Sequence, residues 1–128
     1  ADPNQSNGYG WTPLRYAAER GNAAIVQALL DAGADIHRGN RIEGDRTYLH
    51  HAAQSGDADT VRVFLQAGSD PDACERSGQT PLHHAMLAHI GGDGAAAIVR
   101  ELLAHGANVN HADHYGATPL HRAAEAAN

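Results

Sequence analysis

The chain has 128 residues, with nine basic and 15 acidic side chains and a formal net charge of −6 at pH 7. Every basic residue is an arginine, and the acidic balance argues against a general affinity for nucleic acid, which needs a basic surface that displaces counterions. The length is that of one ordinary domain, and no stretch approaches the roughly 18 to 20 apolar residues of a membrane span.

The N-terminal stretch, ADPNQSNGYG, has no initiating methionine and lacks the charged and apolar regions of a signal peptide. It fits a trimmed end, a vector remnant or the mature end left by signal cleavage. The single cysteine, Cys74, has no partner for an intrachain disulfide, which favours a reducing compartment. We favour a cytoplasmic location, with an exported mature protein as the alternative.

A seven-residue motif occurs four times in chain order: TPLRYAA from Thr12, TYLHHAA from Thr47, TPLHHAM from Thr80 and TPLHRAA from Thr118. The spacings are 35, 33 and 38 residues. A second motif follows each of the first three copies, and its glycine recurs at the same intervals. The three copies are AIVQALLDAGADI, DTVRVFLQAGSDP and AIVRELLAHGANV. Repetition at this period is typical of solenoids built from stacked units.

Each unit is predicted to form a helix, a turn, a second helix and a loop. Threonine is a good N-cap, and proline suits the first helical position because no N–H is needed there. A histidine at the third helical position can reach back to the cap, as glutamate does in a capping box. We therefore interpret His50, His83 and His121 as structural side chains.

The second helix of each unit carries apolar residues at helical spacing and is followed by a glycine suited to a left-handed C-cap. The apolar residues are Ile25, Val26, Leu29, Leu30, Val61, Phe64, Leu65, Ile98, Val99, Leu102 and Leu103, and the glycines are Gly33, Gly68 and Gly106. No unit of this length buries both helices alone, so the units are expected to stack along a shared apolar seam.

The recurring motif Thr-Pro-Leu-His-x-Ala resembles that of the ankyrin repeat family, and the resemblance covers about residues 7–128. It implies an all-α solenoid of stacked antiparallel helix pairs joined by β-hairpin loops, or fingers, in a single domain over 1–128. The repeats are expected at about 7–40, 41–75, 76–112 and 113–128, the last one partial. The resemblance also implies a non-catalytic protein-binding module without a cofactor, which contacts its partner through a concave face of fingers and first helices.

The chain departs from the family pattern at several places. Arg15 replaces the motif histidine in repeat one and is expected to be solvated, Tyr48 replaces proline in repeat two, and Pro71 removes an N–H from its hairpin. That hairpin should be locally weaker. The finger HRGNRIEGDRT (37–47) is extended by two residues, and the insert HIGGDG (89–94) is expected to be a flexible turn rather than additional helix. The fourth repeat stops after one helix; we favour truncation of a longer chain, with a cap or a dimer contact as alternatives.

Other chemistry is disfavoured by the residues themselves. His51 and His84 share one slot in successive repeats, but stacked helices lie roughly 8–10 Å apart, and no cysteine joins them to complete a zinc site. The pair in HADH (111–114) is expected to face solvent. Common catalytic motifs are absent from the sequence, and Glu75 should raise the pKa of the neighbouring Cys74 thiol. A histidine-rich metal-binding accessory protein and a regulatory or spacer fragment of a larger protein remain the alternatives.

The resemblance places partner contacts beside the hairpin glycines and in the variable slots of the first helices. These residues are Tyr9, Trp11, Arg46, Gln54, Arg76, Gln79, His114 and Tyr115. Tryptophan, tyrosine and arginine are also the commonest interface hot spots. Arg38 and Arg41 add positive charge to the fingers, so we include Arg41 in the binding set and expect a protein partner with an acidic contact patch. We expect neither a nucleic-acid nor a membrane partner, and a monomer, with a dimer through the C-terminal half repeat as the alternative.

Overall fold

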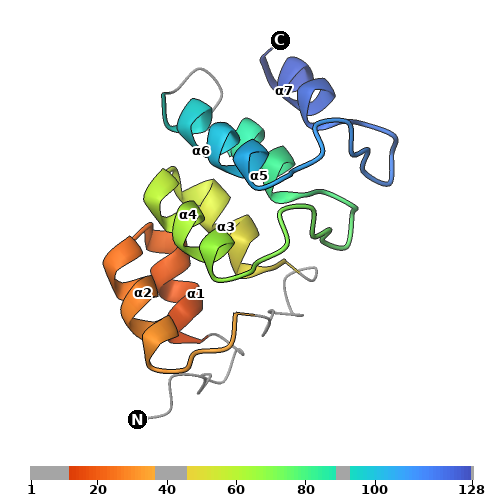
Figure 1. Ribbon diagram of the computed structural model, residues 1–128. Helices are drawn as coiled ribbons and strands as arrows, with labels where there is room; N and C mark the ends of the chain where they lie inside the picture. The colour runs from red at the N-terminus through yellow and green to blue at the C-terminus, as the bar shows by residue number, and fades with distance from the viewer. Residues whose placement is uncertain (1–11, 37–45, 89–92, 128) are drawn as a thin grey trace.

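The computed structural model describes residues 12–36, 46–88 and 93–127, and these segments form a two-layered stack of helices (Figure 1). The helices are α1 (Pro13–Arg20), α2 (Ala23–Asp31), α3 (Tyr48–Ser55), α4 (Ala58–Gln66), α5 (Pro81–Ala88), α6 (Asp93–Ala104) and α7 (Pro119–Ala127). Helices α1, α3, α5 and α7 pack in one layer, and α2, α4 and α6 pack in the other. The predicted all-α solenoid of helix pairs is confirmed. The described parts of the fingers form turns and contain no extended strand.

The motif threonines begin the first-layer helices as predicted. The Thr12 hydroxyl accepts a hydrogen bond from the Arg15 N–H at 3.3 Å, and Pro13 occupies the first turn. Thr47 and His50 form a full capping box, in which each side chain bonds the backbone of the other. The second-layer helices are followed by glycines with left-handed φ, which confirms the predicted C-caps; they are Gly33, Gly68 and Gly106.

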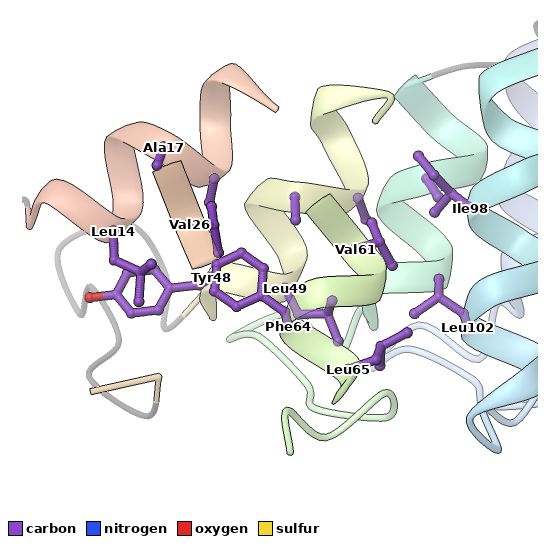
Figure 2. Close-up of a cluster of buried hydrophobic side chains, with 14 of the residues drawn as sticks. Leu14, Ala17, Val26, Tyr48, Leu49, Val61, Phe64, Leu65, Ile98 and Leu102 are labelled. Carbon is purple, nitrogen blue, oxygen red and sulfur yellow. The ribbon is translucent and has the colours of Figure 1, made fainter. Parts of the chain in front are cut away.

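The core is one continuous cluster that runs from repeat one to repeat three (Figure 2). The motif leucines Leu14, Leu49 and Leu82 are at most 2% exposed, and small alanines in the same helices, such as Ala18, Ala53 and Ala85, are fully buried where neighbouring helices meet. Two residues predicted for the seam were wrong, since Ile25 is 50% and Leu103 is 42% exposed. Adjacent helical residues point about 100° apart, and in these two pairs the neighbour takes the core position, since Val26 and Leu102 are fully buried.

Tyr48, which stands where the motif has proline, joins the first two repeats. Its hydroxyl lies 2.7 Å from Thr12 Oγ1, so the two side chains share a buried hydrogen bond. Its ring stacks against Phe64 with the ring centroids 6.1 Å apart. The lost proline is therefore replaced by a contact that spans repeat one, α3 and α4.

Two further predictions were wrong. Arg15 is buried, with 2% of its surface exposed, and it bonds Glu19 at 2.9 Å. It occupies the motif-histidine position, which is also buried at His50 and His83, where, as at Arg15, another repeat packs against the helix. Part of the insert is helical, because α6 begins at Asp93 and has 12 residues where α2 and α4 each have nine. None of the described helices is long and apolar enough to cross a membrane.

Candidate protein-binding face

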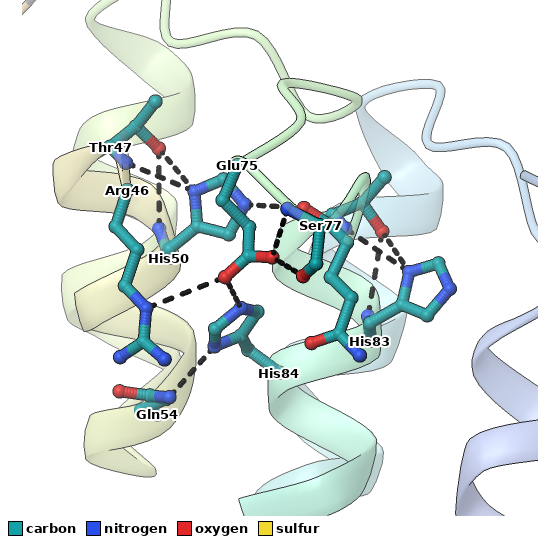
Figure 3. Close-up of polar contacts among 10 residues, drawn as sticks. Arg46, Thr47, His50, Gln54, Glu75, Ser77, His83 and His84 are labelled. Atoms are coloured by element: carbon teal, nitrogen blue, oxygen red, sulfur yellow. Dashed lines mark hydrogen bonds and ion pairs between the residues drawn. The ribbon is translucent and has the colours of Figure 1, made fainter. Parts of the chain in front are cut away.

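His50 and His83 bind both their own helix cap and the next finger, and His121 binds its own cap at Thr118, which confirms the predicted capping role. His50 Nδ1 accepts from the Thr47 N–H at 3.1 Å, and its Nε2 lies 2.8 Å from the Gln79 carbonyl (Figure 3). His83 repeats the pattern with the Ala117 carbonyl at 3.0 Å. An amide N–H only donates and a carbonyl only accepts, so each ring is neutral with its proton on Nε2. Burial lowers the pKa of His50 to about 4, which agrees with this arrangement.

Glu75 is a buried carboxylate at the centre of a polar network between repeats two and three (Figure 3). Its Oε2 lies 3.1 Å from His84 Nε2 and 3.4 Å from Arg46 Nε. Its Oε1 accepts from the Ser77 N–H and hydroxyl. Burial acts to raise the pKa of Glu75, but the Ser77 hydrogen bonds and the His84 interaction outweigh it, so this pKa lies below its ordinary value.

The variable slot after the motif histidine is more buried than the sequence suggested. His84 is 4% exposed and accepts from Gln54 Nε2 at 2.7 Å. Burial lowers the pKa of His84, aided by the Arg46 charge and opposed by Glu75. His51, in the same slot, is 2% exposed, and burial lowers its pKa to about 3. This part of the face is therefore built from neutral imidazoles.

Repeat four has an equivalent pairing between finger and helix. Arg122 Nε lies 2.8 Å from the buried Asp113 Oδ2, as His84 lies near Glu75. Asp113 also accepts backbone N–H groups from Tyr115 and Ala117. In both repeats the carboxylate lies nine residues before the basic side chain. The sequence analysis missed both carboxylates, although this recurring separation was a usable signal.

The third finger (69–80) and the fourth finger (107–118) are joined by hydrogen bonds. The His114 N–H donates to the Ser77 carbonyl at 2.9 Å, and the Asn108 N–H donates to Asp72 Oδ1 at 2.8 Å. The His114 ring lies over Gly78, where an added Cβ would come within 2.5 Å of the imidazole. These contacts hold the two fingers in a defined relative position.

The predicted binding residues fall into three groups. Tyr9, Trp11 and Arg41 lie outside the described residues. Arg46 and Gln54 are brought together through Glu75 and His84, and Gln79 is half-buried with its carbonyl bonded to His50. Arg76, His114 and Tyr115 are exposed on the third and fourth fingers. Tyr115 is 82% exposed, and the Arg122 guanidinium lies 5.7 Å from its ring centroid.

Metal-ligating side chains meet at one unexpected place. The pair in HADH was predicted to face solvent, but His111 Nε2 lies 3.0 Å from Cys74 Sγ. In the part of the chain that the structure describes, no group of three or more His, Cys, Asp or Glu side chains could hold a metal ion. The pKa of the Cys74 thiol is raised, as predicted, although burial and the charges of Asp72 and Asp70 contribute more than Glu75.

Comparison with known proteins gives one consistent result. A family model described as "Ankyrin repeats (3 copies)" matches residues 49–128, and one described as "Ankyrin repeat" matches residues 9–41. A "Putative ankyrin repeat protein" of Rickettsia bellii is 53% identical over 36 residues, which is 28% of this chain and 21% of that protein.

Two animal proteins show similar local matches. The human "Ankyrin repeat and SAM domain-containing protein 3" is 50% identical over 36 residues, covering 28% of this chain and 6% of that protein. The "Transient receptor potential channel pyrexia" of Drosophila melanogaster is 53% identical over 38 residues, covering 30% of this chain and 4% of the channel. The matches therefore span at most about a fifth of these relatives.

Proposed function

The chain belongs to the ankyrin repeat family, whose repeats generally mediate protein–protein interactions, and on that premise we propose that it is a non-catalytic module binding one protein partner. The partner contacts the fingers and the first-layer helices. Its contact surface is acidic. No cofactor takes part in this interaction.

The observation that carries this proposal is the pair of neighbouring exposed fingertips. Tyr115 presents most of its ring to solvent while its backbone N–H is bonded to Asp113 at 2.9 Å. A tyrosine side chain has only two χ angles, so it binds with little loss of conformational entropy. Arg76 is exposed on the adjacent finger, so an aromatic anchor and a positive charge lie on the same side of the stack.

Arg46 adds a second basic contact. Its Nε lies near Glu75 and its side chain remains 33% exposed. A guanidinium oriented by a buried carboxylate offers its remaining N–H groups in a fork that suits another carboxylate. The fingers therefore favour an acidic partner even though the whole chain carries a net charge of −6.

The test begins with a partner identified by affinity capture from the source cell and continues with calorimetric titration of that partner. Tyr115→Ala and Arg76→Glu should each weaken binding about tenfold or more, as expected for residues at a hot spot. The matched control is Arg100→Glu, which makes the same charge change at an exposed position on α6 in the second layer. It should bind like the wild type.

Salt dependence separates an acidic contact from a purely apolar one. Raising the ionic strength should weaken the wild type more than Arg76→Glu, because exposed ion pairs are screened over about 8–10 Å. Circular dichroism confirms that each variant keeps its fold. Wild-type affinity in both finger variants would exclude this face as the interface and indicate that the partner binds another surface of the stack.

A further inference from the structure

We propose that the end of the stack formed by α6 and α7 is a docking site for an amphipathic helix of another protein, one that carries an acidic side chain beside its apolar face. This end face consists of Arg100 and Leu103 on α6 together with Leu120 on α7. All three side chains are exposed. The end face does not include the fingertips, so this inference goes beyond the proposed function.

The two leucines of the end face are exposed although their equivalents in preceding repeats are buried. Leu120 is 69% exposed, whereas the motif leucines of α1, α3 and α5 are at most 2% exposed. Leu103 is 42% exposed, whereas Leu65 at the equivalent place on α4 is 6% exposed. The end face therefore presents to solvent the apolar side chains that join one repeat to another elsewhere in the stack.

The place beside these leucines has the geometry of a helix site. Helices α1, α3 and α5 each pack against a second-layer helix, namely α2, α4 and α6, and α4 also packs against α6. None of the described helices occupies the corresponding place beside α7 and α6 (Figure 1). A helix in that place would contact α7 as α6 contacts α5, and would contact α6 as α6 itself contacts α4. Helices that dock in this way bind through apolar residues at helical spacing.

An ion pair between two neighbouring repeats indicates which charge the docked helix should carry. Arg62 on α4 bonds Glu101 on α6 through Nε at 3.1 Å and Nη2 at 2.9 Å. Arg100 occupies on α6 the position that Arg62 occupies on α4, since each directly follows the equivalent valine of the recurring motif. Arg100 is exposed and belongs to none of the ion pairs among the described residues. An acidic residue on the docked helix would pair with Arg100 as Glu101 pairs with Arg62.

The same charge disfavours a second copy of this chain as the occupant. If a second copy continued the stack from its N-terminal end, its α2 would lie beside α6, with Ala28 at the position of Glu101. Ala28 has no charge to offer Arg100. A two-fold contact between two end faces would place Arg100 of each copy in one interface, and the end face supplies no acid to pair with it. A helix of another protein can supply both the apolar residues and the acid.

The experiment titrates the intact chain into a fluorescently labelled synthetic peptide and follows the fluorescence anisotropy. The peptide has about 18 residues, long enough to form a helix, and is centred on the α6 sequence AAAIVRELLA (95–104), because α6 occupies the equivalent place on α4. We expect saturable binding, and Leu103→Asp and Leu120→Asp should each raise Kd about tenfold or more. The matched control is Ile25→Asp, which makes a similar change at a 50% exposed position of α2, at the other end of the stack. It should bind like the wild type.

A charge exchange tests the pair with Arg100. Arg100→Glu should raise the Kd of the peptide about two- to fivefold, as expected for an exposed ion pair. Replacing the glutamate of the peptide by arginine should weaken binding to the wild type and restore it to Arg100→Glu. Arg100→Glu should keep its affinity for a partner bound at the fingers, and Arg76→Glu should keep its affinity for the peptide. Each of the two proposals can therefore fail without the other.

Four results would overturn the proposal. The first is no saturable binding up to about 1 mM, a very weak affinity. The second is a Kd that Leu103→Asp and Leu120→Asp leave unchanged, or that Ile25→Asp raises equally, in chains whose fold is intact by circular dichroism. The third is a charge exchange that does not restore binding. The fourth is a wild type that sediments as a dimer and a Leu120→Asp variant that sediments as a monomer, which would assign the end face to a second copy.

Discussion

Acidification should destabilise this protein well above the pH at which carboxylates titrate, because histidines are buried in their neutral form. Burial lowers the pKa of His50 from 6.5 to about 4 and that of His51 from 6.5 to about 3. Below about pH 6.5 the unfolded chain therefore binds protons that the native chain does not bind. The free energy of unfolding must fall as the pH falls, and for His50 this loss continues to about pH 4.

The size of the effect follows from these pKa values. One pKa unit corresponds to about 1.4 kcal/mol, so His50 alone accounts for about 2 kcal/mol of lost stability at about pH 5. His51 contributes a similar amount, and the lowered pKa of His84 acts in the same direction. Small domains have about 5–15 kcal/mol of stability in total, so the combined loss is large. The lowered pKa values of Glu75 and Asp113 add a loss that becomes important only below about pH 4.5.

Urea unfolding followed by circular dichroism between about pH 7.5 and pH 5 measures this dependence. His50→Gln removes one buried titrating group, so its stability should fall less with acid than that of the wild type. His121→Gln makes the same substitution at the exposed, equivalent position of α7 and serves as the matched control. A stability that is flat over this range, or an unchanged slope in His50→Gln, would refute the reasoning.

Three other predictions concern stability along the stack. His83→Ala should lower the free energy of unfolding in urea by about 1–2 kcal/mol, because it leaves buried partners without hydrogen bonds. His121→Ala, at an exposed side chain, should lower it clearly less. Equal losses would contradict the role of the next finger. Gly78→Ala should lower the Tm more than Gly116→Ala. Both glycines have left-handed φ, but only the methyl group added at Gly78 meets the His114 ring. Equal changes in Tm would show that this contact does not affect stability. Amide hydrogen exchange should be slow in α4 and fast from about residue 111 onward, because a repeat with one neighbour frays first. Uniform protection to the end of α7 would instead indicate a covered C-terminal end.

The sequence alone determined the repeat architecture and the role of the motif histidines. Both depend on residues close together in the chain. A threonine, proline and histidine within four positions define a helix start, and the apolar spacing of the following helix defines which side packs inward. Because the same local pattern recurs four times, stacking was also predictable, and the observed helix pairs follow it.

The tertiary structure alone decided the contacts between repeats. Arg15 was expected to be solvated, yet it occupies a buried position because its helix face packs against the next repeat. The sequence assigned no bonding partner to His84, yet Glu75 and Gln54 both bond it. Glu75 could have been found from the matching pair Asp113 and Arg122, which has the same nine-residue separation.

Cys74 and His111 show where sequence reasoning ends. They are 37 residues apart and occupy different positions within their fingers, so aligning the repeats does not pair them. Their contact depends on the position of the fourth finger relative to the third. Hydrogen bonds between the fingers, such as the one from the Asn108 N–H to Asp72, fix this relative position. Such contacts form only once the helices have stacked.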